Sequence, residues 1–193
     1  MPNPTPQQKE EFEGSFSYNV GVLLSMSRLY FEKGAQFAAP TGGDVPMYPA
    51  ADALFEMILL RLRTFDSFFR SNASQGDDAV PAHWGASRPS ALVLVNSERA
   101  DISKRLAHLT YSQPPSHEWA IGAMVRRCCE AIDQFLGDLQ PHVKLWEERH
   151  TETKEFLDEH ASNGWEEIWT ENNRHAHRRS TAAPPTSPAS SHP

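Results

Sequence analysis

The stretch "AADALFEMILLRLRTFDSFFRS", residues 50–71, decides the fold class. Its large apolar residues recur at steps of three and four, which is the period of one face of an α-helix. They are Leu54, Ile58, Leu62, Phe65 and Phe69, and the stripe is widened by Phe55, Leu59 and Phe68. Arg61 and Arg63 lie in the middle, where their aliphatic stems can cover apolar surface while the charged heads point outward. The stretch predicts a long helix packed against other helices.

The same helical spacing continues outward along the chain. Residues 8–37 and 116–139 each carry an apolar face with steps of three and four. Residues 91–111 predict a further helix, although the opening "ALVLV" also fits the start of a strand. Residues 144–172 are charged with few apolar residues, which predicts a peripheral helix or a segment that orders only on a partner. Long helices without convincing strand pairs predict an all-α fold, a bundle of four to five helices with disordered termini.

Composition divides the chain into four parts. We predict a flexible, Pro-rich N-terminus over residues 1–8 and a helical bundle domain over 9–143. Residues 144–172 form an acidic segment with three basic and nine acidic side chains. Residues 173–193 are rich in Pro, Ser and Ala and carry almost no large apolar side chain. Such a tail cannot bury enough surface to offset the entropy of ordering, so we predict that it is disordered.

Several features indicate a cytoplasmic protein without a membrane span. The first residues have no basic segment followed by an apolar one, so the sequence shows no signal peptide. No apolar run approaches the ~20 residues that a membrane helix needs. The adjacent Cys128 and Cys129 cannot frame a disulfide scaffold or a four-ligand zinc site. The preceding Arg126 and Arg127 would lower the pKa of Cys129 if its thiol were exposed.

Motifs and charge restrict the chemistry further. The sequence contains no HExxH pair and no Gly-rich phosphate loop, so we expect neither a metal nor a cofactor. The net charge is −7 at pH 7, which argues against a broad electrostatic hold on duplex nucleic acid. A small basic pocket remains compatible with this charge.

The stretch "DISKRLAHLTY", residues 101–111, is the candidate for such a pocket. On a helix its polar side chains share one face. They are Asp101, Lys104, Arg105 and His108. The ordinary interpretation is a solvated face with a histidine at the edge of the core. The alternative is a basic pocket, in which histidine transfers protons near neutral pH and arginine holds a phosphate. Such a pocket could cleave a phosphodiester through its own 2′-hydroxyl, without a metal.

"RLRTFDSFF" followed at a distance by "SKRLAHLTY" resembles the pattern of HEPN-like helical proteins. These proteins are bundles of four to five helices, and many act in bacterial defence, toxin–antitoxin or RNA-processing systems. The active members are metal-independent ribonucleases. Their motif is an arginine, four to six residues and a histidine, and dimerisation assembles the cleft. The resemblance covers residues 15–140 and implies a homodimer in which His108 is the motif histidine.

The sequence departs from this pattern at the arginine. The positions where the motif places it hold Ser103, Ile102 and Asp101. Either Arg105 or Lys104 takes its role beside His108, or the ribonuclease chemistry is absent and the bundle serves as a binding module. The resemblance also implies that Arg63 could reach the same cleft from the 50–71 helix.

Three functions remain open, and only one of them is enzymatic, so the sequence does not decide whether the protein is an enzyme. The first is a HEPN-like module that binds RNA, a nucleotide or a protein partner in a bacterial defence or toxin–antitoxin type system, with Arg63 and Asp101 as binding residues. The second is a metal-independent endoribonuclease, with His108 as acid–base and Arg105 or Lys104 on the phosphate. The third is a structural or adaptor protein that docks through residues 144–172.

Overall fold

The computed structural model describes residues 4–38, 48–71, 79–90, 93–107, 119–139 and 144–165. Its helices are α1 (Pro6–Ala38), α2 (Tyr48–Arg70), α3 (Asn96–Ala107), α4 (Ile121–Asp138) and α5 (Lys144–Asn163), with a short 3-10 helix, η1 (Pro81–Trp84), after α2. The described residues contain no strand, and the predicted all-α fold is confirmed. His108 and the tail 173–193 lie outside the described residues.

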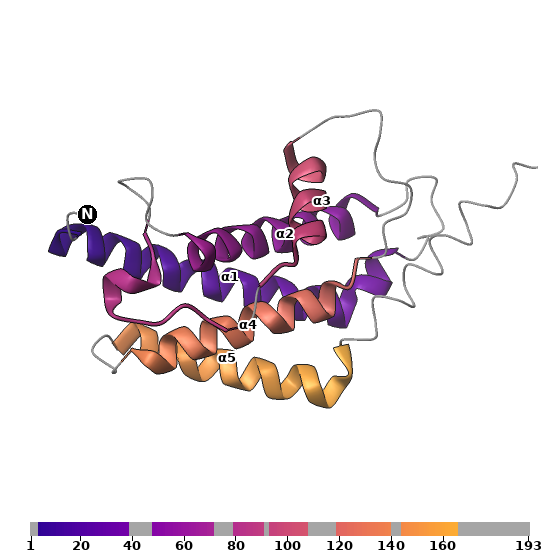
Figure 1. Cartoon of the computed structure of the whole chain (residues 1–193). Helices are drawn as coiled ribbons and strands as arrows, with labels where there is room; N and C mark the ends of the chain where they lie inside the picture. The colour runs from indigo at the N-terminus through magenta and orange to yellow at the C-terminus, as the bar shows by residue number, and fades with distance from the viewer. Residues whose placement is uncertain are drawn as a thin grey trace, which may run out of the picture.

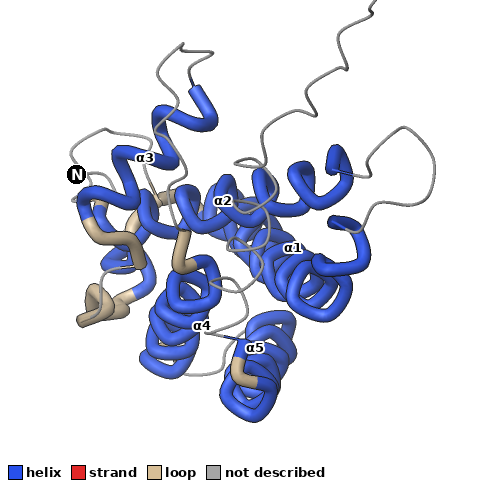
Figure 2. The backbone as a smooth tube through the Cα atoms, turned by 90° about the vertical axis from the view of Figure 1, so that its right-hand side faces the viewer, coloured by secondary structure: helices blue, strands red, loops and turns tan. Residues whose placement is uncertain are grey.

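Four helices form a bundle, and α3 stands outside it (Figure 1). Seen end-on in Figure 2, α1, α2, α4 and α5 occupy the four corners. In this square α1 packs against α2 and α5, and α4 packs against the same two helices. The short α3 packs on α2 and projects away from α4 and α5. The helix that contains Lys104 and the backbone of Arg105 is therefore the most peripheral of the five.

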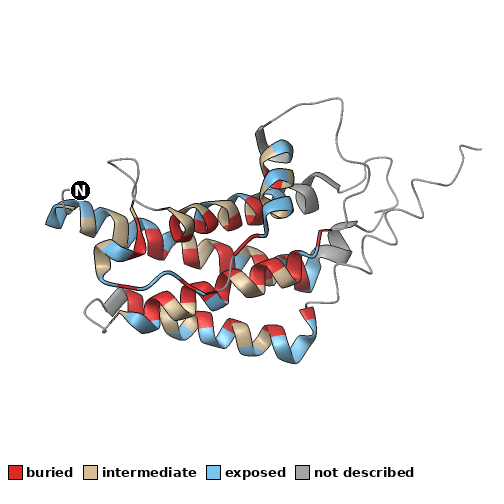
Figure 3. Ribbon diagram, viewed as in Figure 1, coloured by how far each residue is buried: buried red, intermediate tan, exposed pale blue. Residues whose placement is uncertain are grey.

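The apolar stripe of α2 lies in the centre of the bundle. All of its residues are buried except Leu54, which is half-buried. Figure 3 shows how the buried positions of the helices face inward. The ring centroids of Phe65 and Phe68 each lie 5.5 Å from that of Phe16 on α1. Phe135 of α4 completes the cluster at 5.2 Å from Phe16. Aromatic rings with large buried areas thus tie three helices together, as the spacing of residues 50–71 predicts.

The described part of the acidic segment is a packed helix of the bundle. The buried residues of α5 recur at helical spacing, and they are Trp146, Thr153, Phe156 and His160; Trp165, just after the helix, is also buried. Arg149 of α5 donates a hydrogen bond from Nε to Ser17 Oγ at 3.1 Å. Its guanidinium lies over Gly21 of α1, where an added Cβ would come within 3.2 Å of Nη1. Gly21 therefore leaves room for the Arg149 guanidinium against α1.

The connection between α2 and α3 lies against the bundle. Trp84 of η1 packs on Phe12 of α1, with 4.4 Å between ring centroids. Val93 and Leu94, from the stretch that also fits a strand, are buried in a bend instead. The described connector thus delivers the start of α3, at Asn96, onto the end of α2.

Candidate anion-binding site between α2 and α3

Polar contacts hold the first half of α3 in place. Among its residues 96–104 the only buried side chain is Ile102. Glu98 accepts hydrogen bonds from Nη2 of Arg127 on α4 at 2.7 and 2.6 Å. The same carboxylate accepts the backbone N–H of Val95 at 2.8 Å, which satisfies one donor near the start of the helix. Ion pairs and hydrogen bonds, more than apolar burial, therefore set the position of α3.

Asp66 is the centre of these contacts. Its carboxylate is fully buried on α2, where an unpaired charge would be strongly unfavourable. Oδ1 accepts hydrogen bonds from Arg70 Nε at 2.8 Å and from the backbone N–H of Leu94 at 3.2 Å. Oδ2 lies 3.5 Å from Nε of Arg99 on α3 and accepts no hydrogen bond within the described part of the chain. Asp66 thus joins α2, the connector and α3 at one point.

Arg63 turns toward α3 instead of toward solvent. Its Nη1 donates hydrogen bonds to Ser103 Oγ and, at 3.4 Å, to the backbone carbonyl of Arg99. The Ser103 hydroxyl in turn donates to the same carbonyl at 2.7 Å. Ser103 holds one of the positions where the resemblance expects an arginine, so a guanidinium from α2 lies beside that position. No carboxylate of the described residues pairs with Arg63.

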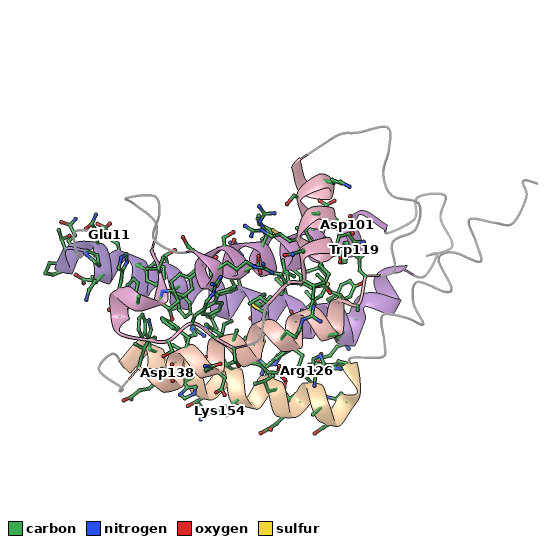
Figure 4. All side chains as sticks on the ribbon, viewed as in Figure 1. Glu11, Asp101, Trp119, Arg126, Asp138 and Lys154 are labelled. Atoms are coloured by element: carbon green, nitrogen blue, oxygen red, sulfur yellow. The ribbon has the colours of Figure 1, made fainter. Side chains whose placement is uncertain are left out.

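The other predicted site residues are only partly described. Lys104 is exposed on α3, next to Ser103. Asp101 is half-buried on the same helix and has an interaction partner. Figure 4 labels it on the outer helix, far from Lys154 on α5. The backbone of Arg105 belongs to α3, whereas its side chain and all of His108 lie outside the described residues. The structure brings Arg63 to the Lys104 end of α3 and leaves the place of His108 open.

Sequence reasoning missed most of the charged network. Its unassigned members are Asp66, Arg70, Arg88, Glu98, Arg99 and Arg127. One signal was available for Asp66, because a carboxylate directly after Phe65 in an apolar stripe implies a buried partner. The pairing of Glu98 with Arg127 could not be predicted in this way, because the two residues lie on different helices and the spacing within a helix does not relate them.

Comparison with protein-family models, curated proteins and solved structures gives no match to this chain. None of the helices in the described ranges is both long and apolar enough to cross a membrane. Within the same ranges, no three His, Cys, Asp or Glu side chains come together as metal ligands. The function of the site must therefore be inferred from its own geometry. Its main functional groups are the guanidinium groups of arginine side chains.

The two cysteines are core residues of α4. Both side chains are fully buried, and burial raises the pKa of each thiol well above its usual value. A charge on Cys129 would raise the pKa of Cys128 further, and Glu130 does the same for Cys129 against a smaller lowering by Arg28. The exposure that would let neighbouring arginines activate Cys129 is absent. Neither thiol is suited to act as a nucleophile.

The buried thiols predict a loss of stability at alkaline pH. An unfolded thiol ionises near pH 8.5, whereas the folded chain keeps the proton. Above this pH the native state therefore binds more protons than the unfolded state does. The free energy of unfolding should therefore decrease above about pH 8.5, by roughly 2 kcal/mol for each thiol at pH 10. Urea unfolding at pH 7.5 and 10 measures this decrease. The double variant Cys128→Ala/Cys129→Ala should show a smaller decrease, and an equal one in both proteins would contradict the prediction.

Proposed function

We propose that the protein is a HEPN-like binding module that holds RNA or a nucleotide by its phosphate at the Arg63–Lys104 end of α3. The observation that carries the proposal is the guanidinium of Arg63, which is fixed by two neutral acceptors, Ser103 Oγ and the Arg99 carbonyl. A guanidinium without a carboxylate partner keeps its full charge and further N–H donors for a ligand. Its planar fork matches a phosphate well.

The surroundings of Arg63 favour an anion with several charges over a neutral or cationic protein surface. Lys104 adds an exposed ammonium one residue from Ser103. The exposed side of α5, on the far side of the bundle, carries Glu147, Glu148, Glu155 and Asp158. An anionic ligand is repelled there and attracted to Arg63 and Lys104. Because the whole chain has a net charge of −7, most of its surface disfavours an anion, and this basic site is preferred. As the resemblance implies, the proposal includes a homodimer in a bacterial defence or toxin–antitoxin type system, and sedimentation at micromolar concentration measures the dimer.

A metal-independent ribonuclease is the second candidate, and the same contact favours it. Arg63 supplies a cation beside Ser103, where the sequence itself lacks the motif arginine. His108 would then act as the acid–base group on the 2′-hydroxyl and the leaving oxygen. The adaptor function receives less support, because Trp146 of α5 and Trp165, just after this helix, are buried against the bundle.

Substitution of Lys104 tests the binding proposal. We expect Lys104→Gln to weaken binding of a labelled single-stranded RNA about fivefold, because one exposed charge contact contributes up to ~1 kcal/mol. Lys154→Gln removes the same charge from the exposed side of α5 and should leave the affinity unchanged. Fluorescence anisotropy in EDTA measures both. Equal affinities for Lys104→Gln and the parent protein would contradict the proposal.

The same mixtures separate the two candidates. RNA recovered from the EDTA reactions is run on a denaturing gel beside a reaction with His108→Ala. Cleavage that disappears in His108→Ala establishes the ribonuclease, whereas binding of intact RNA by both proteins establishes the binding module.

A further inference from the structure

We infer that Arg88, at the end of the α2–α3 contact opposite Arg63, forms a second phosphate-binding site, with Arg99 between the two, so that the ligand is a strand with at least two phosphates. The inference rests on the proposed function, which places the first phosphate at Arg63 and Lys104. It adds a second phosphate-binding position, and two such positions define the ligand as a strand.

Two arginines of the region have their charge balanced by a carboxylate of the fold. Arg70 donates from Nε to Asp66, from Nη1 to Asn96 Oδ1 at 3.2 Å and from Nη2 to the Leu94 carbonyl. All three of its nitrogens thus have acceptors, and its charge is balanced by Asp66.

The charge of Arg127 is also balanced within the fold, through Nη2 and Nε. It donates from Nη2 to both oxygens of Glu98 and from Nε to the Val93 carbonyl at 3.3 Å. The two buried or half-buried carboxylates, Asp66 and Glu98, therefore compensate Arg70 and Arg127 one for one.

Arg88 and Arg99 are left in excess. Arg88 is exposed, and among the described residues it donates from Nη2 alone, to the Arg70 carbonyl at 2.8 Å. Arg99 has 37% of its side chain exposed, and its Nε lies 3.5 Å from Asp66 Oδ2, a carboxylate that Arg70 already balances. Each guanidinium has five N–H donors, so both keep donors that can face a ligand. The region carries six basic side chains and four described carboxylates, so a net positive charge remains. The basic residues are Arg63, Arg70, Arg88, Arg99, Lys104 and Arg127, and the acidic ones are Asp66, Glu98, Asp101 and Asp138.

The contacts place these groups in a row. Arg88 is tied to the carbonyl of Arg70 at the end of α2, Arg99 to Asp66 one turn earlier, and Arg63 to the carbonyl of Arg99. At a rise of ~1.5 Å per residue, α2 covers about 10 Å between Arg63 and Arg70. A phosphate oxygen contacts a guanidinium at about 2.8 Å, so one phosphate cannot serve both ends of such a row. Two phosphates of one strand can.

A free polyphosphate would also present two phosphates to these arginines. Assays with different ligands distinguish a polyphosphate from a nucleic-acid strand. A uridine decamer presents successive phosphates along a strand, adenosine triphosphate presents three joined phosphates, and adenosine monophosphate presents one. For single strands the logarithm of affinity falls with the logarithm of salt by ~0.7 for each phosphate contact. The salt slope therefore counts the contacts that a substitution removes.

Arg88→Gln is the decisive variant, because Arg88 is exposed and holds no carboxylate. With the decamer, we expect its salt slope to fall by about 0.7 and its affinity about threefold or more. Arg88→Lys keeps the charge and should retain the slope, and Lys154→Gln serves as the control on α5. Binding of adenosine monophosphate should be the same in Arg88→Gln and the parent protein.

The outcomes distinguish this inference from the proposed function. If Lys104→Gln weakens decamer binding and Arg88→Gln does not, the second site is wrong and the first stands. If the parent protein does not bind the decamer, both are wrong. If Arg88→Gln loses as much affinity for adenosine triphosphate as for the decamer, the ligand is a polyphosphate and the inference of a nucleic-acid strand is wrong.

Discussion

Asp66→Asn is expected to lower the free energy of unfolding by about 3 kcal/mol, the low end of the cost of breaking a buried ion pair. The substitution keeps the shape of the side chain but removes the charge that balances Arg70 and faces Arg99. Two guanidinium groups would then lie next to each other without a counter-charge. Because Asp66 also accepts the Leu94 N–H, the loss should spread to the connector that leads into α3.

Chemical denaturation measures this loss, and hydrogen exchange localises it. Faster amide exchange is expected in α3 than in α4, since α3 depends on the Asp66 contacts and α4 is held by apolar packing. Asp158→Asn makes the same chemical change on the exposed side of α5 and should alter stability by less than ~0.5 kcal/mol. If Asp66→Asn were as mild as that control, Asp66 would not be the centre of the network.

Phe135→Ala is expected to destabilise the protein by about 4 kcal/mol, the usual range for deleting a fully buried aromatic ring. Phe135 has no exposed surface and lies where α4 meets α1, α2 and α5. Its ring centroid lies 5.2 Å from Phe16, 5.3 Å from Phe68 and 5.9 Å from Trp146. Rings on every side prevent the site from closing over the cavity that the substitution leaves.

Urea unfolding of Phe135→Ala gives the size of the effect, and Phe135→Leu tests its cause. Leucine refills much of the volume, so its cost should be about half that of alanine. Tyr18→Ala removes a ring that is 64% exposed on α1 and should cost less than ~1 kcal/mol. A loss below 1 kcal/mol in Phe135→Ala would show that the aromatic cluster does not hold the bundle together.

The contrast between these two positions follows from how each is encoded. Phe135 belongs to an apolar stripe, and its burial could be predicted from residues three and four steps away. The partners of Asp66 come from its own helix, the connector and α3, and only Arg70 lies at helical spacing from it. The prediction for α2 was therefore good for its apolar residues and poor for its charged ones. Arg63 illustrates this, because the spacing alone placed its head in solvent and only the resemblance pointed it toward a cleft, whereas it binds Ser103.

The acidic segment shows the same division. Its few apolar residues left open a peripheral helix or a segment that waits for a partner. In the structure Thr153 and His160 join Trp146, Phe156 and Trp165 in one buried face, and His160 places Nε2 3.1 Å from the Gly122 carbonyl. Two polar residues completed a stripe that hydrophobicity alone did not reveal.

Local spacing along the chain was enough to predict a helical bundle and the course of its long helices. Apolar residues at steps of three and four fix a helix and its buried face through local geometry alone. The tertiary structure alone decided which charged side chains meet, because ion pairs across α2, α3 and α4 join residues with no regular spacing. It turned Arg63 to α3, buried Asp66 under Arg70 and Arg99, and left Arg88 in excess. The charge that a ligand meets is what remains after these pairings, and pairings are set by packing in three dimensions.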